Sequence, residues 1–169
     1  KQNADKKLTS EQMTALKNIE IAQHQGKQKF LLYGVTGSGK TQIYIEMALK
    51  ARALGKQALI LVPEIVLTGQ LVTSFKEYFA DDVAVIHSRL SIGERNDTFW
   101  RIRTKQVSII IGARSALFAP FEDLGLIVMD EEHDPSYKQD ESPRYHSHDI
   151  IEKMAEIYHA TLIMGSATP

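Results

Sequence analysis

The chain lacks cysteine altogether and has only 5 prolines and 1 tryptophan among its 169 residues. Without cysteine there is no disulfide framework, which fits an expected location in the cytoplasm. Long hydrophobic runs are also absent: residues 124–129 form one of the longest, whereas a membrane-spanning helix needs about 20 apolar residues. The charges nearly cancel, with 20 Lys and Arg against 21 Asp and Glu. Because bulk charge gives no attraction for nucleic acid, any nucleic-acid site must be local.

What the chain does have is a composition typical of a globular domain, with 43% hydrophobic and 24% charged residues. Short apolar runs alternate with segments of helical periodicity, which predicts an α/β fold with a mainly parallel sheet between two layers of helices. We expect one domain over residues 1–169, cut from a longer protein. Strands are expected at 29–33, 57–62, 83–86, 107–111, 124–129 and 161–164, and helices at 9–23, 41–54, 65–79, 91–104 and 147–158.

The strongest motif is GVTGSGKT at residues 34–41, which matches G-x-x-x-x-G-K-[ST] at every fixed position. An apolar strand precedes it and a helix follows, as a phosphate-binding P-loop requires. Glycines let backbone N–H groups surround phosphate oxygens at the positive end of that helix. Lys40 is expected to reach the β- and γ-phosphates, and the Thr41 hydroxyl to bind Mg²⁺. The predicted nucleotide-binding residues of the loop are Gly34, Thr36, Gly37, Ser38, Gly39, Lys40 and Thr41.

Two acids follow the apolar run 124–129, at Asp130 and Glu131. A P-loop ATPase needs a carboxylate on a neighbouring strand to hold magnesium, and we assign that role to Asp130. Glu131 is placed to orient and deprotonate the attacking water. Adjacent carboxylates repel unless a cation lies beside them, which agrees with a Mg²⁺ site.

Four passages resemble the conserved motifs of superfamily 2 helicases of the DEAH-like type. Residues 61–68 are similar to motif Ia, residues 111–116 to motif Ib, residues 130–133 (Asp-Glu-Glu-His) to motif II, and residues 165–168 (Gly-Ser-Ala-Thr) to motif III. The sequence is most similar to the bacterial helicases that restart stalled replication forks in four segments: the P-loop, residues 63–65, residues 87–88 with 94–95, and residues 130–139. The chain departs from that pattern at Ala113, usually Thr, and at Ser147-His148, usually Ala-Arg.

The resemblance implies a three-layer RecA-like P-loop NTPase domain, the first ATP-binding lobe of an ATP-dependent DNA helicase that uses ATP and Mg²⁺. It places the strand before motif III between the P-loop strand and the Asp130 strand. It adds His133 to the catalytic set, and Ser166 and Thr168 as sensors of the γ-phosphate. The implied partners are single-stranded and forked DNA, a second RecA-like lobe carrying an arginine finger, and primosome proteins. The lobe alone is expected to hydrolyse ATP poorly or not at all.

Residues 134–146 are expected to form a long irregular loop that mixes aromatic and basic side chains. Rings stack on bases and cations meet phosphates, so the loop suits single-stranded DNA. The resemblance implies that such a loop couples DNA binding to ATP hydrolysis. An alternative is a surface loop packed by its own aromatics. The predicted nucleic-acid contacts, from this loop and from motifs Ia and Ib, are Pro63, Thr68, Arg114, Tyr137, Lys138, Arg144 and Tyr145.

Several assignments stay open at this level. Gln12 is either the adenine-reading glutamine that the resemblance implies or the third residue of a helix capping box with Thr9. Arg114 is either a DNA contact or a solvated cation. A metal cluster of His133, His146 and His148 is a further alternative. For the whole, the alternatives are another superfamily 2 nucleic-acid translocase, or a P-loop nucleotide switch that does not move on nucleic acid.

Overall fold

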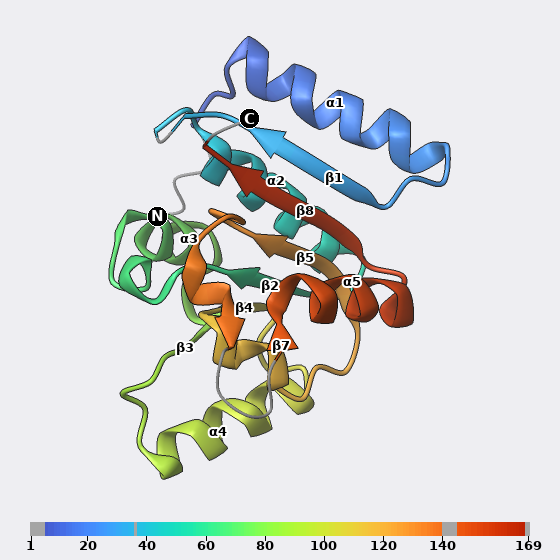
Figure 1. Ribbon diagram of the computed structural model, residues 1–169. Coiled ribbons are helices and arrows are strands. Elements are labelled where there is room, and N and C mark those ends of the chain that lie inside the picture. Colours follow the sequence, from blue (N-terminus) through green and yellow to red (C-terminus); the bar gives the residue numbers. More distant parts are fainter. Residues whose placement is uncertain (1–5, 36, 140–144, 168–169) are drawn as a thin grey trace.

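The computed structural model describes residues 6–35, 37–139 and 145–167 of the chain (Figure 1). Its main sheet has parallel strands in the order β1-β8-β5-β2-β4-β3, and the arrows of β1, β8, β5 and β2 point the same way in Figure 1. The strands are β1 (Lys29–Tyr33), β2 (Gln57–Leu61), β3 (Val83–Ile86), β4 (Ile109–Gly112), β5 (Leu124–Met129) and β8 (Thr161–Ser166). The α-helices are α1 (Ser10–His24), α2 (Lys40–Ala53), α3 (Gln70–Phe79), α4 (Ile92–Arg103) and α5 (Ser147–Tyr158).

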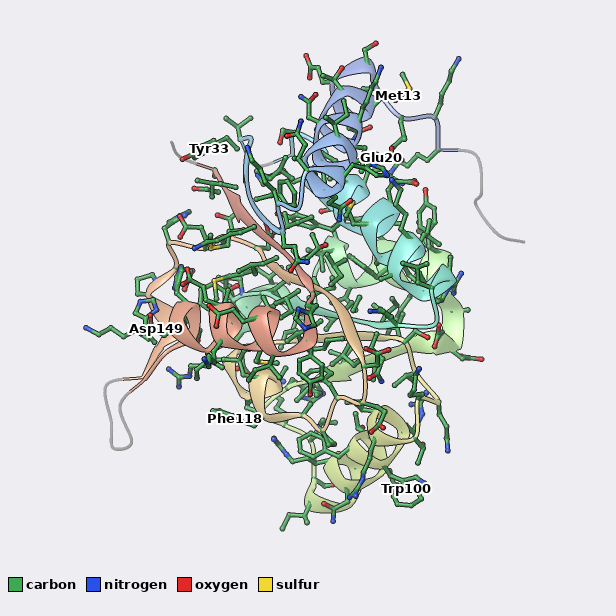
Figure 2. The ribbon with its side chains drawn as sticks, turned by 90° about the vertical axis from the view of Figure 1, so that its right-hand side faces the viewer. Met13, Glu20, Tyr33, Trp100, Phe118 and Asp149 are labelled. Carbon is green, nitrogen blue, oxygen red and sulfur yellow. The ribbon has the colours of Figure 1, made fainter. Side chains whose placement is uncertain are left out.

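The sheet lies between two layers of helices, and Figure 2 shows α2 and α5 on opposite sides of the strands. One apolar cluster joins α1, α2 and α3 to the face that carries Ile60 of β2 and Val128 of β5. A second cluster joins α4 and α5 to the other face, through Leu61 and Met129 among others. All five residues of β2 are buried because both faces of the sheet are covered. The predicted three-layer α/β fold is confirmed.

The strand order brings the predicted functional loops to one edge of the sheet. β8 lies between β1 and β5, as the resemblance implied. Tyr33 at the end of β1 pairs with Ser166 of β8, and Met129 at the end of β5 pairs with Met164. The P-loop, motif II and motif III therefore leave the carboxyl ends of three adjacent strands. In open α/β sheets this edge is where ligands bind.

The prediction of a helix over residues 65–79 is wrong for its first residues. The chain instead forms a short 3₁₀ turn, η1 (Glu64–Val66), and the α-helix begins only at Gln70. The cause lies at Gly69, which precedes the helix in an extended conformation with φ −97° and ψ −167°. By contrast, the capping boxes expected at Thr9 and Ser91 are both formed and start α1 and α4.

The prediction of an irregular loop over residues 134–146 is also partly wrong. It begins with a 3₁₀ turn, η4 (Pro135–Tyr137), and continues in a two-stranded antiparallel hairpin of β6 (Lys138–Gln139) and β7 (Tyr145–His146). Two further 3₁₀ turns are η2 (Ala80–Asp82) and η3 (Arg114–Phe118). Within the described residues no helix is long and apolar enough to cross a membrane.

Candidate ATPase site and nucleic-acid face

The P-loop connects β1 to α2 and is anchored to the neighbouring strand β8. The Gly34 N–H donates to the Ser166 carbonyl at 3.0 Å. Gly39 precedes α2 with φ +90°, a left-handed conformation that glycine adopts without steric cost. A β-carbon added at Gly37, where φ is +82°, would meet nothing within 4 Å. The loop therefore stays open over the positive end of α2, as phosphate binding requires.

Lys40 is buried, with 8% of its surface exposed, so its ammonium group needs partners. Its Nζ donates to the Gly34 carbonyl and, at 3.4 Å, to the Val35 carbonyl. These main-chain acceptors hold the lysine against the P-loop. Phosphate oxygens would be stronger acceptors for the same ammonium group than neutral carbonyls. The position of Lys40 thus fits its predicted role.

Asp130 follows β5 and is held by two buried tyrosines. The Tyr44 hydroxyl donates to Asp130 Oδ1 at 2.7 Å, and the Tyr137 hydroxyl donates to the Asp130 carbonyl at 2.5 Å. Burial, followed by the negative charge of Asp130, raises the pKa of both Tyr44 and Tyr137 far above the ordinary value of 10.0. Both phenols therefore remain donors at neutral pH. Sequence reasoning missed Tyr44, although it lies four residues after Lys40 and so on the same face of the helix.

Tyr137 does not have the position that the sequence predicted. Its ring is 1% exposed and belongs to the core under α5. Its carbonyl also accepts a hydrogen bond from the buried Ser147 hydroxyl at 2.6 Å. Stacking on a DNA base needs an exposed ring face, so the structure contradicts Tyr137 as a nucleic-acid contact. The reason is that η4 turns the chain back toward the end of β5, where the Tyr137 ring joins the same core cluster as Met129.

The rest of motif II turns sharply after Asp130. Glu131 has φ +49°, a left-handed conformation that costs a non-glycine residue on the order of 1 kcal/mol. Its carboxylate lies 3.8 Å from His133 Nε2. The next acid, Glu132, donates its N–H to the Gly165 carbonyl at 2.9 Å and accepts from His148 Nε2 at 3.0 Å. Motif II is thus tied both to motif III and to the start of α5.

The histidines do not form the metal cluster considered as an alternative. His146 and His148 are joined by their Nδ1 atoms at 2.8 Å, and His148 also reaches Glu132. His133 is paired with Glu131 instead. Within the part of the chain that the structure describes, no group of three or more His, Cys, Asp or Glu side chains could hold a metal ion.

A cavity of about 630 Å³ collects the predicted nucleotide site at the edge of the sheet. Its lining combines the ammonium of Lys40, the hydroxyl of Thr41 and the carboxylates of Asp130 and Glu131. Hydroxyl and carboxylate oxygens are the ligands that Mg²⁺ takes, so the residues present fit ATP with magnesium. The loop backbone and Gln12 also contribute. Of the predicted residues, the cavity is lined by Gln12, Gly37, Gly39, Lys40, Thr41, Asp130 and Glu131.

Other predicted nucleotide contacts lie beside this cavity or outside the described residues. Ser166 is 2% exposed and its carbonyl anchors Gly34. Ser38 is exposed in the P-loop. Thr36 and Thr168 fall outside the described residues.

Gln12 forms the capping box and also reaches the P-loop. The Gln12 side-chain oxygen accepts from the main-chain N–H of Thr9 at 2.9 Å, and the main-chain N–H of Gln12 donates to the Thr9 hydroxyl at 3.2 Å. Its amide nitrogen donates to the Gly39 carbonyl at 3.1 Å. The capping role is therefore present, and the same side chain connects α1 to the nucleotide cavity. Adenine reading by Gln12 stays a prediction.

A second depression, of about 460 Å³, brings motifs Ia and Ib to the same face as the segment after motif II. Glu64 of motif Ia accepts from the Ser88 N–H at 3.1 Å, and the Ser88 hydrogen bonds lower the pKa of Glu64. The Arg114 guanidinium donates to the carbonyls of Ser136 and Lys138, at 3.3 and 2.6 Å. The Arg114 side chain thus ties motif Ib to η4 and β6.

The remaining predicted nucleic-acid residues are only partly brought to this face. Lys138 and Thr68 are exposed, whereas Pro63 is buried. Tyr145 contributes its backbone to β7, where it pairs with Gln139. Arg144 lies outside the described residues.

Comparison with known proteins agrees with this geometry. Residues 9–169 match the DEAD/DEAH box helicase family, and the chain belongs to that family. It is 52% identical to the replication restart protein PriA of Bacillus subtilis over 96% of this chain and 20% of that protein. It is 46% identical to PriA of Haemophilus influenzae over 99% of this chain and 23% of that protein. The chain thus spans about a fifth of the length of these curated relatives.

Solved structures give the same fold. RecG bound to a three-way DNA junction matches with a TM-score of 0.72 and 25% identity, over 98% of this chain and 21% of RecG. The SWI2/SNF2 ATPase core of Sulfolobus solfataricus, solved with double-stranded DNA, matches with a TM-score of 0.63 and 16% identity, over 96% of this chain and 32% of that one. The second likeness supports the RecA-like fold alone.

Proposed function

We propose that this chain is the ATP-binding lobe of a DNA helicase that acts in replication restart. The observation that carries the proposal is the single cavity in which the P-loop, Lys40, Thr41, Asp130 and Glu131 meet. The similarity to the PriA proteins, at 46–52% identity for the two relatives above, supports restart as the process. Primosome proteins, a second RecA-like lobe and a location in the cytoplasm are proposed on the same similarity.

The residues of the cavity divide the chemistry of ATP hydrolysis among them. Lys40 would exchange its carbonyl partners for phosphate oxygens, and Thr41 and Asp130 would hold the magnesium ion. Mg²⁺, when bound, neutralises charge on the phosphates. Glu131 accepts a proton from the attacking water, and His133, 3.8 Å away, orients the Glu131 carboxylate. Ser166, at the end of β8, and Thr168 sense the γ-phosphate.

We propose that DNA binds across the depression between motifs Ia and Ib. Thr68, Arg114, Lys138, Arg144 and Tyr145 are the proposed contacts, with Pro63 shaping motif Ia. The binding of a three-way DNA junction by RecG, whose fold is shared, supports DNA as the polymer. Through its bonds to Ser136 and Lys138, Arg114 connects this face to the segment that holds Asp130.

ATP hydrolysis by the full-length protein, measured without polymer, with single-stranded DNA and with RNA of equal length, tests the proposal. We expect Mg²⁺-dependent hydrolysis that DNA stimulates more than RNA, and that Lys40→Ala abolishes. Equal or greater stimulation by RNA would instead favour another superfamily 2 translocase. Hydrolysis that neither polymer changes would favour a nucleotide switch.

A further inference from the structure

Tyr44 is a wholly buried residue of α2 that the proposed mechanism does not use. None of its surface is exposed, and it belongs to the core cluster between α2 and the sheet. Its hydroxyl bonds to the Asp130 carboxylate at 2.7 Å. A phenol that donates to a carboxylate makes a charge-assisted hydrogen bond, stronger and more directional than a bond between neutral groups. The bond therefore fixes the orientation of the carboxylate as well as satisfying the hydroxyl.

A third element meets the same hydroxyl. A β-carbon added at Gly165 of β8 would lie 1.8 Å from the Tyr44 hydroxyl and 3.0 Å from Asp130 Oδ1. No side chain fits in that space, so only glycine at position 165 lets the hydroxyl reach the carboxylate. The Gly165 carbonyl also accepts from the Glu132 N–H. The helix after the P-loop, motif II and motif III thus converge on one hydroxyl.

We propose that Tyr44 is a positioning residue of the ATPase site. Its hydroxyl holds the Asp130 carboxylate in the orientation that binds Mg²⁺, and Gly165 is required because it leaves room for that bond. The inference rests on the proposed function, since it assigns the magnesium to Asp130. It adds a residue of α2 outside the P-loop, and a reason for glycine at position 165, to the metal site.

The arrangement of the hydrogen bonds separates this role from simple core packing. Tyr137 also lies beside Asp130, but its hydroxyl bonds to the main-chain carbonyl, which does not rotate with the side chain. Tyr44 bonds to the carboxylate itself. Loss of a hydrogen-bond partner of a metal-ligating group typically lowers metal affinity by about 10–100-fold. Loss of a packing contact alone lowers stability and leaves the metal requirement unchanged.

Tyr44→Phe in the full-length protein tests the proposal, because it removes the hydroxyl and keeps the ring. Fluorescent ADP is titrated into the protein in EDTA and across a Mg²⁺ series. We expect ADP affinity in EDTA to match the unaltered protein, while the Mg²⁺ concentration for half-maximal tight binding rises about 10-fold or more. Tyr158→Phe is the matched control: its hydroxyl donates to the Phe121 carbonyl at 3.2 Å, on the far face of the sheet from α2. A Mg²⁺ dependence in Tyr44→Phe equal to that of the control overturns the proposal.

Gly165→Ala tests the steric half of the inference. Alone, it is expected to raise the Mg²⁺ requirement at least as much as Tyr44→Phe, because the new methyl group displaces the hydroxyl. In the Tyr44→Phe background the same change is expected to add less, since the displaced atom is already gone. Effects that multiply independently overturn the link between Gly165 and the hydroxyl. The proposed function fails separately, if the unaltered protein shows no Mg²⁺-dependent binding of ADP.

Discussion

The two halves of the nucleotide cavity are held together in different ways. The P-loop is held mostly by main-chain bonds: Gly34 donates to Ser166, and Ser38 donates to Val35, both at 3.0 Å, while Gln12 adds one side-chain bond to the Gly39 carbonyl. The Lys40 ammonium bonds only to carbonyls of the same loop among the contacts described. Motif II also has main-chain bonds, from Asp130 to Leu61 and from Glu132 to Gly165. Its Asp130 is held in addition by two side chains, since the hydroxyls of Tyr44 and Tyr137 bond to it from α2 and from η4.

A bound nucleotide must therefore replace hydrogen bonds in the P-loop half, whereas the hydrogen bonds that hold Asp130 are already formed. Phosphate must replace the carbonyl partners of Lys40, so this half is completed by the ligand. The bonds to Asp130 use one carboxylate oxygen and the main-chain carbonyl, and leave the second carboxylate oxygen for a metal or its water. Preorganised groups need no reorganisation at the moment of reaction. We expect substitutions in the P-loop half to affect nucleotide binding itself, and substitutions in the motif II half to affect hydrolysis, the Mg²⁺ requirement or folding.

The largest effects are expected where the two halves act on ATP itself. Glu131→Gln keeps the shape of the side chain and removes the base, so ATP hydrolysis should fall by about 10²–10⁴-fold while ATP affinity is kept. Lys40→Ala should lose both affinity and hydrolysis, because it removes the cation that meets the phosphates. Equilibrium binding of ATP beside steady-state hydrolysis measures both. Equal losses of ATP affinity in the two variants would contradict the division between the halves.

Next in size is the effect of Tyr137 on folding. Tyr137→Ala empties a core position and should lower the free energy of unfolding by about 3–5 kcal/mol, as for other aromatic truncations. Tyr137→Phe loses only the bond to the Asp130 carbonyl and should cost about 1 kcal/mol. Urea denaturation of the two variants measures the difference. An unchanged midpoint in Tyr137→Ala would mean that the ring is not buried in solution.

Tyr137 shows what could not be predicted from the sequence. Aromatics interleaved with charges after motif II suggested an exposed DNA-binding loop, and nothing in the local pattern distinguishes a ring that faces solvent from one that faces the core. Burial is decided by η4, which turns the chain back beneath α5, and by the Ser147 hydroxyl that bonds to the Tyr137 carbonyl. Both are contacts between segments, which a pattern of single residues does not contain.

The elements themselves followed closely from the sequence because their signals are local. Apolar runs predicted every strand of the main sheet, and Thr9 and Ser91 marked two helix starts to within one residue. The helix start at Gln70 was missed because Gly69, in the middle of a periodic stripe, interrupts it. Tyr44 was missed because it lies among the many buried residues of α2, where an aromatic side chain looks like ordinary core. Its spacing from Lys40 was the signal that could have found it.

A smaller effect is expected from the bond that holds Tyr137 in place. Ser147 is wholly buried, and its hydroxyl donates to the Tyr137 carbonyl at 2.6 Å. Ser147→Ala leaves that carbonyl without this donor and should lower the free energy of unfolding by about 1–2 kcal/mol. The cost should shrink in a Tyr137→Ala background, where the segment is already displaced. Additive costs would show that Ser147 stabilises α5 alone.

The smallest effect concerns the charge at Asp134, where η4 begins. Hydrogen bonds from the Ser136 hydroxyl and N–H hold the pKa of Asp134 below its ordinary value of 3.8. A carboxyl whose pKa is lower in the folded state stabilises the fold fully above its unfolded pKa, and that contribution is lost as pH falls through the folded pKa. Asp134→Asn keeps a capping oxygen and removes the charge, so at neutral pH it should lower the free energy of unfolding by no more than about 0.5 kcal/mol.

Urea denaturation of the variant and the unaltered chain, from neutral pH to below 3.8, should show the two unfolding free energies converging as the pH falls. Ser136→Ala should reproduce part of this convergence, because it removes the hydroxyl that lowers the pKa. Curves that stay parallel over the whole range would show that the Asp134 charge does not hold η4.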